Sequence, residues 1–497
     1  MVLHFSSPII VALITGLLCS TCQPTKSIPS PATPNIIFIL ADDLGWADLP
    51  VYGNQFNEAP HLTQLARDGM RFTNAYAACP VCSPTRASIQ SGQYPAHVGV
   101  IDFITGHWRP YEEVIVPKNR TQHLPAEIVT VGEAMKASGY ATGYFGKWHL
   151  GGAEEHLPGN QGYEDWRIHR RGTFYNLKSK QAIFPEDPAL DDSTRLSTAL
   201  TDYSLQFIEG NKDRPFFLFL AHYDVHVQLD ADQELIDKYL NKDKWEDYPS
   251  NAVYAAMIEH IDDGVGRLVA KLESLGLTDN TMIVFFSDNG GLVSRFDEIP
   301  LLAKSKLSVY EGSPLQYVAS SNAPLRAEKG TVFEGGIREP MIVKWPAKVK
   351  AGSVSDALVT SVDFYPTFVE LANGTPPIEQ ELDGESFVPV LEEKSADPER
   401  AIFWHYPVYH HDVPASAIRK GDWKLIEYLT DERVELYNLK QDIGETQDLS
   451  AQHPDKRMEL LTLLSEWRVS VAAEFPVPNP DFDPDRRKEW GRHPDRK

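Results

Sequence analysis

Long apolar runs are missing from most of this sequence. No stretch of its 497 residues stays apolar over the ~20 positions that a membrane-spanning helix needs, so we do not expect an integral membrane protein. The apolar run at 8–18 covers about 11 residues, a length typical of a signal-peptide core. We therefore expect residues 1–22 to be a signal peptide, residues 23–34 to be a Pro/Ser/Thr-rich linker, and the protein to be exported, either periplasmic or secreted.

Cysteine is also scarce. The four cysteines form two CxxC pairs, Cys19/Cys22 and Cys79/Cys82. Lipid attachment at Cys19 or Cys22 stays an alternative, although the residues before them match a lipobox poorly. Two CxxC pairs can bind zinc, and one pair can act as a redox centre. Cleavage of the signal peptide would remove the first pair, so a zinc ion would have too few ligands. The residues that follow the second pair indicate another use of Cys82.

Positive charge is in short supply. Lys and Arg number 47 against 70 Asp and Glu, which gives a net charge of −23. This balance argues against a general nucleic-acid-binding protein, because such proteins need a basic face to displace the counterions of phosphates. An anionic substrate would require cations gathered locally at its site.

Short apolar runs alternate with helical patterns over the first 345 residues. The runs are Asn35–Leu40, Tyr140–Phe145, Phe216–Ala221, Thr281–Phe286 and Met341–Lys344. Continuous apolar runs are typical of strands buried on both faces. A helical pattern at 258–275, with apolar residues at steps of three and four, ends at Gly276. The sequence therefore predicts an α/β fold with a large mixed, mostly parallel sheet between layers of helices.

The pattern changes after about residue 395. Short, closely spaced strands are expected at Ala401–Tyr406, Ser416–Arg419, Trp423–Tyr428 and Val434–Tyr437. A helix with Leu460, Leu461, Leu464 and Trp467 on one side is expected at about 455–471. We expect a main domain at 35–396 and a smaller α+β C-terminal subdomain with an antiparallel sheet at 397–497.

Polar side chains follow two of the predicted strands. Asp42 and Asp43 come after the first strand, and Asp288 and Asn289 come after the strand at 281–286. Ligands of open α/β sheets bind beyond the carboxyl ends of the strands. Carboxylate and amide oxygens favour Ca²⁺ or Mg²⁺ over zinc. Helix capping explains either pair alone, whereas both pairs together favour a metal site.

Cationic residues follow other strand ends. They are Lys147, His149 and His226, and Lys329 lies in a later loop. Each of them alone would be read as a solvated residue. As a set beside metal-binding oxygens, they suit the binding of an oxyanion.

The segment Cys82-Ser83-Pro84-Thr85-Arg86, followed by Gly92, resembles the signature of the formylglycine-dependent (type I) sulfatases of the alkaline-phosphatase-like superfamily. The residues named above occur in the order that this family shows, and Glu334–Pro340 is similar to a further family landmark. The resemblance covers roughly residues 34–470 and extends to bacterial polysaccharide sulfatases and arylsulfatases. Gln90-Ser91 and Val227-Gln228 depart from the usual pattern, and the second departure concerns the substrate pocket.

The resemblance implies a role for each site residue. A formylglycine-generating (sulfatase-maturating) enzyme would convert Cys82 to 3-oxoalanine (formylglycine), and Arg86 would hold the hydrated aldehyde. One Ca²⁺, with Mg²⁺ as the alternative, would be bound by Asp42, Asp43, the modified Cys82, Asp288 and Asn289. Lys147 and Lys329 would neutralise the sulfate, His226 would protonate the leaving alcohol, and His149 would help to release the sulfate.

The expected substrate is a sulfated carbohydrate, polysaccharide or oligosaccharide. Aromatic and cationic groups for the rim of a substrate pocket are offered by Trp404, His405 and Arg419, with Tyr409–His411. The alternative is that the aromatic residues among them fill the interface between the two sheets. Other readings of the protein are a phosphate or phosphonate ester hydrolase of the same superfamily, a non-catalytic glycan-binding protein, and a CxxC redox or zinc protein.

Overall fold

The structure is a computed structural model that describes residues 1–2, 33–168, 195–246, 248–295, 299–394 and 396–496. All but the first two residues of the predicted signal peptide, and all but the last two of the predicted linker, lie outside the described residues. In the part of the chain that is described, every helix is too short or too polar to cross a bilayer. Thr33–Lys497 forms one compact unit.

A nine-stranded sheet lies at the centre of this unit. Its strands are β1 (Asn35–Ala41), β2 (Met70–Tyr76), β4 (Ala141–Gly146), β5 (Asp165–Arg167), β6 (Phe216–Ala221), β7 (Thr281–Ser287), β8 (Arg338–Lys344), β9 (Ser353–Ser355) and β10 (Val359–Thr360). The order is β10-β2-β8-β7-β1-β6-β4-β5, with β9 paired to β2. Only β8 runs antiparallel to its neighbours among these described strands. The predicted mixed, mostly parallel sheet is therefore confirmed.

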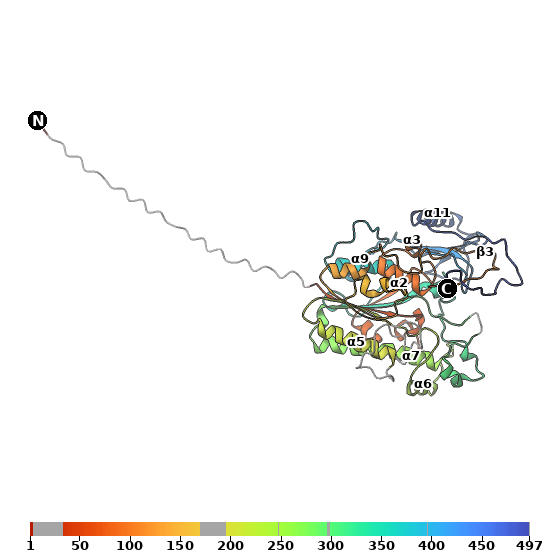
Figure 1. The fold of residues 1–497 in the computed structure, drawn as a ribbon, viewed down its shortest axis with the longest axis horizontal. Coiled ribbons are helices and arrows are strands. Elements are labelled where there is room, and N and C mark those ends of the chain that lie inside the picture. The colour runs from red at the N-terminus through yellow and green to blue at the C-terminus, as the bar shows by residue number, and fades with distance from the viewer. Residues whose placement is uncertain (3–32, 169–194, 247, 296–298, 395, 497) are drawn as a thin grey trace. The chain divides into compact units, whose positions relative to one another are not determined.

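Helices cover both faces of the sheet, which explains why the central strands are apolar throughout (Figure 1). On β1, Ile37 and Ile39 point into the core beneath α5 (Leu196–Gly210) and α7 (Ala252–Ser274), the helix predicted at 258–275. The alternate residue Phe38 points to the other face, where its ring lies 4.7 Å from that of Phe364 in α9 (Phe364–Leu371). Every side chain of this strand is thus buried.

The remaining elements are short. The helices are α1 (Pro60–Arg67), α2 (Cys82–Ser91), α3 (Pro95–Val98), α4 (Val131–Ala137), α6 (Gln233–Leu240), α8 (Glu334–Ile337) and α10 (Val388–Leu391). The 3-10 turns are η1 (Trp46–Asp48), η2 (Pro50–Tyr52), η3 (Glu154–His156), η4 (Pro158–Gln161), η5 (Thr278–Asn280), η6 (Lys304–Tyr310), η7 (Pro314–Gln316) and η8 (Ser361–Asp363).

The C-terminal part carries the predicted antiparallel sheet. Its strands are β11 (Ala401–Tyr406), β12 (Ala415–Lys420), β13 (Trp423–Tyr428) and β14 (Val434–Asn438), paired in chain order. On one face, Leu460 and Leu464 of α11 (Pro454–Ser470) pack against Ile418. After α11, β15 (Val477–Pro478) pairs with β3 (Val114–Ile115). The boundary expected at 396/397 falls between α10 and β11 and stays a prediction.

A buried lysine of the C-terminal sheet pairs with two buried glutamates outside that sheet, one of them in α8 just before β8. The Nζ atom of Lys424 on β13 lies 2.9 Å from Glu334 Oε1 and 2.8 Å from Glu445 Oε1, and all three side chains are fully buried. A buried charge is costly to leave without its partner. We expect Lys424→Met to lower the free energy of unfolding by about 3–5 kcal/mol, measured by urea denaturation at pH 7. Lys440→Met is the control, because the Lys440 side chain is 76% exposed and its nearest carboxylate oxygen is 3.8 Å away. Equal stability of the two variants would contradict a structural role for the buried pair.

Candidate active site

The predicted site residues gather at one edge of the large sheet. Strands β4, β6, β1 and β7 are adjacent and parallel, so their carboxyl ends lie together. Because β8 is antiparallel, the loop that precedes it reaches the same edge. Asn289 Nδ2 donates to Asp43 Oδ1 over 2.8 Å, and Arg86 Nη2 lies 3.8 Å from Asp42 Oδ1. With the contacts described below, this edge brings together the ten residues predicted as catalytic or metal-binding: Asp42, Asp43, Cys82, Arg86, Lys147, His149, His226, Asp288, Asn289 and Lys329.

Three carboxylates in the site pair with three cations. Lys147 Nζ lies 2.6 Å from Asp42 Oδ2, and Lys329 Nζ lies 2.7 Å from Asp43 Oδ1. Arg86 donates from Nη2 and Nε to Asp288 Oδ2, over 2.6 and 2.9 Å. All six side chains are buried, and their formal charges cancel. Burial alone would raise the pKa of Asp43, but Lys329, His226 and Lys147 hold it well below its usual range.

Two buried oxygens of this cluster accept no hydrogen bond from any residue that the structure describes. They are Asp42 Oδ1 and Asn289 Oδ1. A buried acceptor without a partner is unusual and needs an explanation. Ligand atoms of Asp42, Asp43 and His226 lie within 4.8 Å of one another, which is a spacing suited to a shared metal ion. Buried carboxylate and amide oxygens fit a hard divalent cation such as Ca²⁺ or Mg²⁺.

Cys82 is the first residue of α2, beside this cluster. Its Sγ atom lies 3.3 Å from His149 Nδ1, and His149 Nε2 lies 2.9 Å from the carbonyl oxygen of Ile104. A carbonyl oxygen only accepts, so Nε2 carries the proton, and the neutral ring offers the Nδ1 lone pair to position 82. Burial, followed by the charge of Lys147, lowers the pKa of His149 well below its usual value, which keeps the ring neutral.

The unmodified thiol is poorly suited to act as a nucleophile. Burial raises the pKa of Cys82, although Lys147 and Lys329 oppose the shift. The thiolate is the reactive form of cysteine, and a raised pKa leaves the neutral thiol dominant at pH 7. The surrounding cations therefore do not activate Cys82 as a simple thiolate.

His226 reaches the cluster from the loop after β6. Its Nδ1 atom donates to the carbonyl oxygen of Val227 over 2.6 Å, and its Nε2 atom lies 3.6 Å from Asp43 Oδ2. Burial, followed by the charges of Lys329 and Lys147, lowers the pKa of His226 to about 3 despite the opposing charge of Asp43. Nε2 is thus the ring nitrogen that faces the carboxylate cluster.

Unusual backbone conformations position these groups. Asp43 and His149 adopt φ values of 63° and 58°, a region that residues with a side chain occupy rarely and mostly at functional sites. Gly146, which precedes Lys147, has φ 118°, and a Cβ atom there would lie 1.7 Å from the carbonyl oxygen of Ala221. Glycine at this position lets β4 approach β6 closely where Lys147 leaves the sheet.

The expectation that Trp404, His405 and Arg419 line a substrate rim is wrong. Trp404 is only 1% exposed, and its Nε1 atom donates to the carbonyl oxygen of Ala77 over 2.7 Å. Arg419 is buried beside the same sheet and donates to the hydroxyl of Tyr76. The side chains of Trp404 and Arg419 fill the interface between the two sheets, because one face of the C-terminal sheet packs on the large sheet.

His405 is buried as well, between Ser416 Oγ at 2.7 Å and the carbonyl oxygen of Glu474 at 2.8 Å. Burial lowers the pKa of His405 to about 4. Between pH 6.5 and about 4 the folded state therefore binds fewer protons than the unfolded state. The contribution of the neutral His405 ring to the free energy of unfolding is fully present above pH 6.5 and is lost as the pH falls. From pH 7.5 to pH 5, the wild type should lose ~2 kcal/mol more unfolding free energy than His405→Gln.

Urea denaturation at the two pH values measures this difference. The control is His61→Gln, which replaces an exposed histidine and should keep the wild-type pH dependence. A His405→Gln variant that loses as much stability as the wild type would refute the assignment.

Two aromatic residues near the site carry no signal in the sequence pattern. The His107 ring lies 4.4 Å from the His410 ring and 4.9 Å from the Trp490 ring. Neither His107 nor Trp490 follows a strand or belongs to a motif, so only the folded structure associates them.

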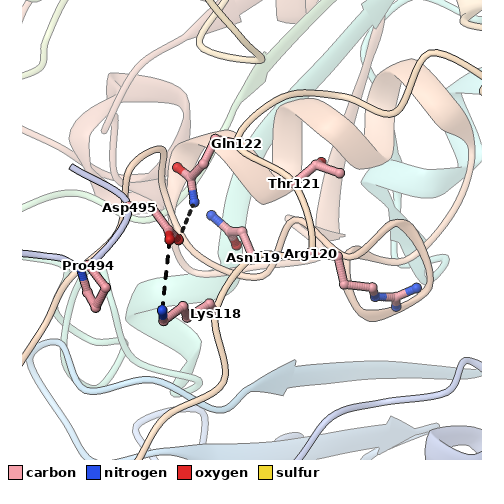
Figure 2. Close-up of a pocket in the computed structure, with 7 residues that line it drawn as sticks. All are labelled: Lys118, Asn119, Arg120, Thr121, Gln122, Pro494 and Asp495. Atoms are coloured by element: carbon pink, nitrogen blue, oxygen red, sulfur yellow. Dashed lines mark hydrogen bonds and ion pairs between the residues drawn. The ribbon is translucent and has the colours of Figure 1, made fainter. Parts of the chain in front are cut away.

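A separate pocket of about 440 Å³ lies between Lys118–Gln122 and Pro494–Asp495 and includes none of the catalytic candidates (Figure 2).

Comparisons with known proteins agree with this geometry. A family model described as sulfatase matches residues 34–375, and one described as N-sulphoglucosamine sulphohydrolase, C-terminal, matches residues 327–468. A sulfatase of Formosa agariphila is 31% identical and covers 94% of both chains. N-acetylgalactosamine-6-sulfatase of Mus musculus is 31% identical over 80% of this chain and 72% of its own length. The crystal structure of Ps i-CgsB in complex with k-i-k-neocarrahexaose has a TM-score of 0.73 and 27% identity, and it covers 90% of this chain and 94% of that chain.

The mixed sheet, with a carboxylate and cation cluster at one edge, is thus an alkaline-phosphatase-like hydrolase fold. Within that class, the chain belongs to the sulfatase family, and it is an enzyme that hydrolyses sulfate esters.

Proposed function

We propose that this enzyme removes sulfate from a sulfated carbohydrate by means of a formylglycine made from Cys82. The observation that carries the proposal is the position of Cys82 on α2 with Arg86, whose partner Asp288 belongs to the buried carboxylate cluster. The charges of Lys147 and Lys329, which pair with Asp42 and Asp43 of that cluster, act on the Cys82 thiol. The raised pKa of the thiol supports it further, because unmodified Cys82 would be a weak nucleophile.

The modified residue supplies the chemistry that the thiol lacks. When hydrated, the aldehyde offers two hydroxyls on one carbon, so that one takes the sulfuryl group and the other drives release of sulfate by C–O cleavage. His149 Nδ1, which faces position 82, would accept the proton of a hydroxyl there. Arg86, which its bond to Asp288 keeps in place, would hold and stabilise the hydrated side chain at position 82.

The lysines and His226 would act on the substrate. Lys147 and Lys329 would turn from their carboxylate partners toward the sulfate oxygens and neutralise them. The charge of the bound sulfate would raise the pKa of His226, so that protonated Nε2 donates to the leaving alcohol. Asp42, Asp43, Asp288 and Asn289 would hold one Ca²⁺, or Mg²⁺, which supplies further positive charge to the sulfate when bound.

A carbohydrate substrate is supported by the names of the relatives. One is an N-acetylgalactosamine-6-sulfatase, and the structure of Ps i-CgsB was solved with k-i-k-neocarrahexaose.

We further propose export after removal of residues 1–22, and maturation of Cys82 by a separate formylglycine-generating enzyme. The catalytic domain would span 35–396 and the C-terminal subdomain 397–497.

Two measurements test the proposal. Peptide mass analysis of protein expressed together with a maturating enzyme should find an aldehyde in place of the Cys82 thiol. Sulfate release from a panel of defined sulfated oligosaccharides should then identify a substrate, with phosphate and phosphonate esters as the comparison. A retained thiol together with full activity would overturn the formylglycine mechanism, and preferential hydrolysis of phosphonate esters would overturn the substrate class.

A further inference from the structure

His149 is held by the segment of chain between α3 and β3. The carbonyl oxygen of Ile104 accepts from His149 Nε2 over 2.9 Å, and the amide of Ile104 donates to Ser83 Oγ over 3.1 Å. Ser83 Oγ in turn donates to the carbonyl oxygen of His149 over 2.9 Å. The main chain at Ile104 is therefore tied to the His149 ring directly and to the His149 backbone through Ser83. The ring nitrogen that faces Cys82 depends on where this main chain lies.

No regular secondary structure supports the main chain at Ile104. Residues 99–113, all of which the structure describes, run from α3 to β3 without a helix or strand. The carboxylate of Asp102 supports them instead, because its Oδ1 atom accepts from the amide of Phe103 and its Oδ2 atom from the amide of His107, each over 2.8 Å. These two amides lie on either side of Ile104 in the chain. An Asp side chain that accepts from amides further along the chain closes a turn without a strand or helix.

Asp102 is itself fixed from two sides. Asn119 holds its main chain, since Asn119 Oδ1 accepts from the amide of Asp102 over 2.9 Å and Asn119 Nδ2 donates to its carbonyl oxygen over 3.1 Å. The hydroxyl of Tyr406 on β11 donates to Asp102 Oδ1 over 3.2 Å. Asp102 is only 4% exposed, so water competes little for these hydrogen bonds. The loop around Ile104 is thus anchored at one buried carboxylate.

We propose that Asp102 is a positioning residue for His149, which holds the loop around Ile104 so that His149 keeps its proton on Nε2 and directs the Nδ1 lone pair at position 82. This inference rests on the proposed role of His149 as the group that accepts a proton from the hydrated side chain at position 82. It adds the residue that keeps the ring in the form this role needs. A ring protonated at Nδ1 would present a donor to position 82, and a donor cannot accept that proton.

NMR of the ring nitrogens, in the full chain with isotope-labelled histidine, reads the tautomer of His149 directly. The signals of His149 among the 16 histidines are those that His149→Gln lacks. Burial raises the pKa of Asp102 to about 7, so the measurement is made at pH 8, where the carboxylate is ionised. The wild type should show a single form protonated at Nε2. Asp102→Ala should show a mixture in which the form protonated at Nδ1 is also populated.

The same variants should be slower as enzymes. General acid–base catalysis contributes ~10²–10⁴-fold, so a ring that is only partly in the required form should lower kcat about 10-fold. KM should stay within about twofold, because the defect lies at position 82 and not in the binding of the substrate. Asp102→Asn keeps one acceptor oxygen and should fall between the wild type and Asp102→Ala in both measurements. It carries the same test if Asp102→Ala does not fold.

Asp262→Ala is the matched control. Asp262 of α7 is also a buried aspartate that accepts from two main-chain amides, those of His61 and Leu62 at the start of α1, over 3.0 and 2.7 Å. Its loss should lower the urea midpoint as the loss of Asp102 does. The tautomer of His149 and kcat should both stay at their wild-type values.

A His149 ring that keeps the single form protonated at Nε2 in the Asp102 variants would overturn the positioning role, and so would an equal loss of kcat in Asp262→Ala. The NMR measurement needs neither a substrate nor a modified Cys82. An enzyme found to work without formylglycine would therefore lose the proposed mechanism, while the tautomer of His149 would still decide the role of Asp102.

Discussion

Cys82→Ala is expected to lower kcat for sulfate-ester hydrolysis by on the order of 10⁴-fold or more, because it removes the group that would take the sulfuryl moiety. The fold should survive, since alanine fits the first position of α2 and the ion pairs of Arg86, Lys147 and Lys329 do not involve the thiol. Sulfate release by the purified variant, with its urea midpoint measured alongside, separates loss of chemistry from loss of structure.

Cys79→Ala provides the matched control. Cys79 is also buried and belongs to the same CxxC pair, and both cysteines are free thiols. Its carbonyl oxygen accepts from Thr85 Oγ1 over 2.9 Å, a bond of the main chain that alanine retains. We expect Cys79→Ala to keep kcat within about threefold and to lose ~1 kcal/mol of stability through the smaller side chain. Equal inactivation of both variants would instead support a redox or zinc role for the pair.

Residues that follow the buried strands could be predicted from the sequence, because strands and their ends are local features. Asp42 follows an uninterrupted apolar run that only a strand with both faces covered explains, and the same reasoning applies to Asp288. Lys329 is different. It lies in a loop without any local signal, and only the resemblance to sulfatases associated it with the site.

Features that depend on distant packing could not be predicted in this way. The alternation of β11 shows that Trp404 and His405 point to opposite faces, but not that the Trp404 face meets Tyr76 across the interface between the sheets. The edge strands β5, β9 and β10 are two or three residues long, too short to give a pattern. The approach of Trp490 to His107 joins two irregular segments far apart in the chain, and periodicity carries no information about such contacts.

Removal of divalent metal is expected to abolish sulfate release and to lower stability. Without a divalent ion, the three carboxylates and three cations of the site cancel, and Lys147 and Lys329 remain bonded to Asp42 and Asp43. A bound Ca²⁺ would give the cluster a net positive charge and free the lysines for an anionic substrate. Chelation should therefore inactivate the enzyme, and Ca²⁺ at about 100 times its dissociation constant should restore activity and add ~2.7 kcal/mol to the unfolding free energy.

Asn289→Ala tests whether this response comes from the proposed site. The change is neutral in charge and removes Asn289 Oδ1, one of the buried oxygens that accept no hydrogen bond within the described part of the chain. It should raise the Ca²⁺ concentration needed for half-maximal activity by ~10-fold or more and shrink the stabilisation by Ca²⁺ correspondingly. Asn54→Ala is the matched control. The Asn54 side chain is also buried, but it is hydrogen-bonded to the main chain of Phe56, Asn57 and Ala47. Its loss should lower the free energy of unfolding and leave the response to Ca²⁺ unchanged. If Asn289→Ala responded to Ca²⁺ as the wild type does, the oxygens without donors would have to be satisfied in some other way, and the metal site would have to be sought elsewhere.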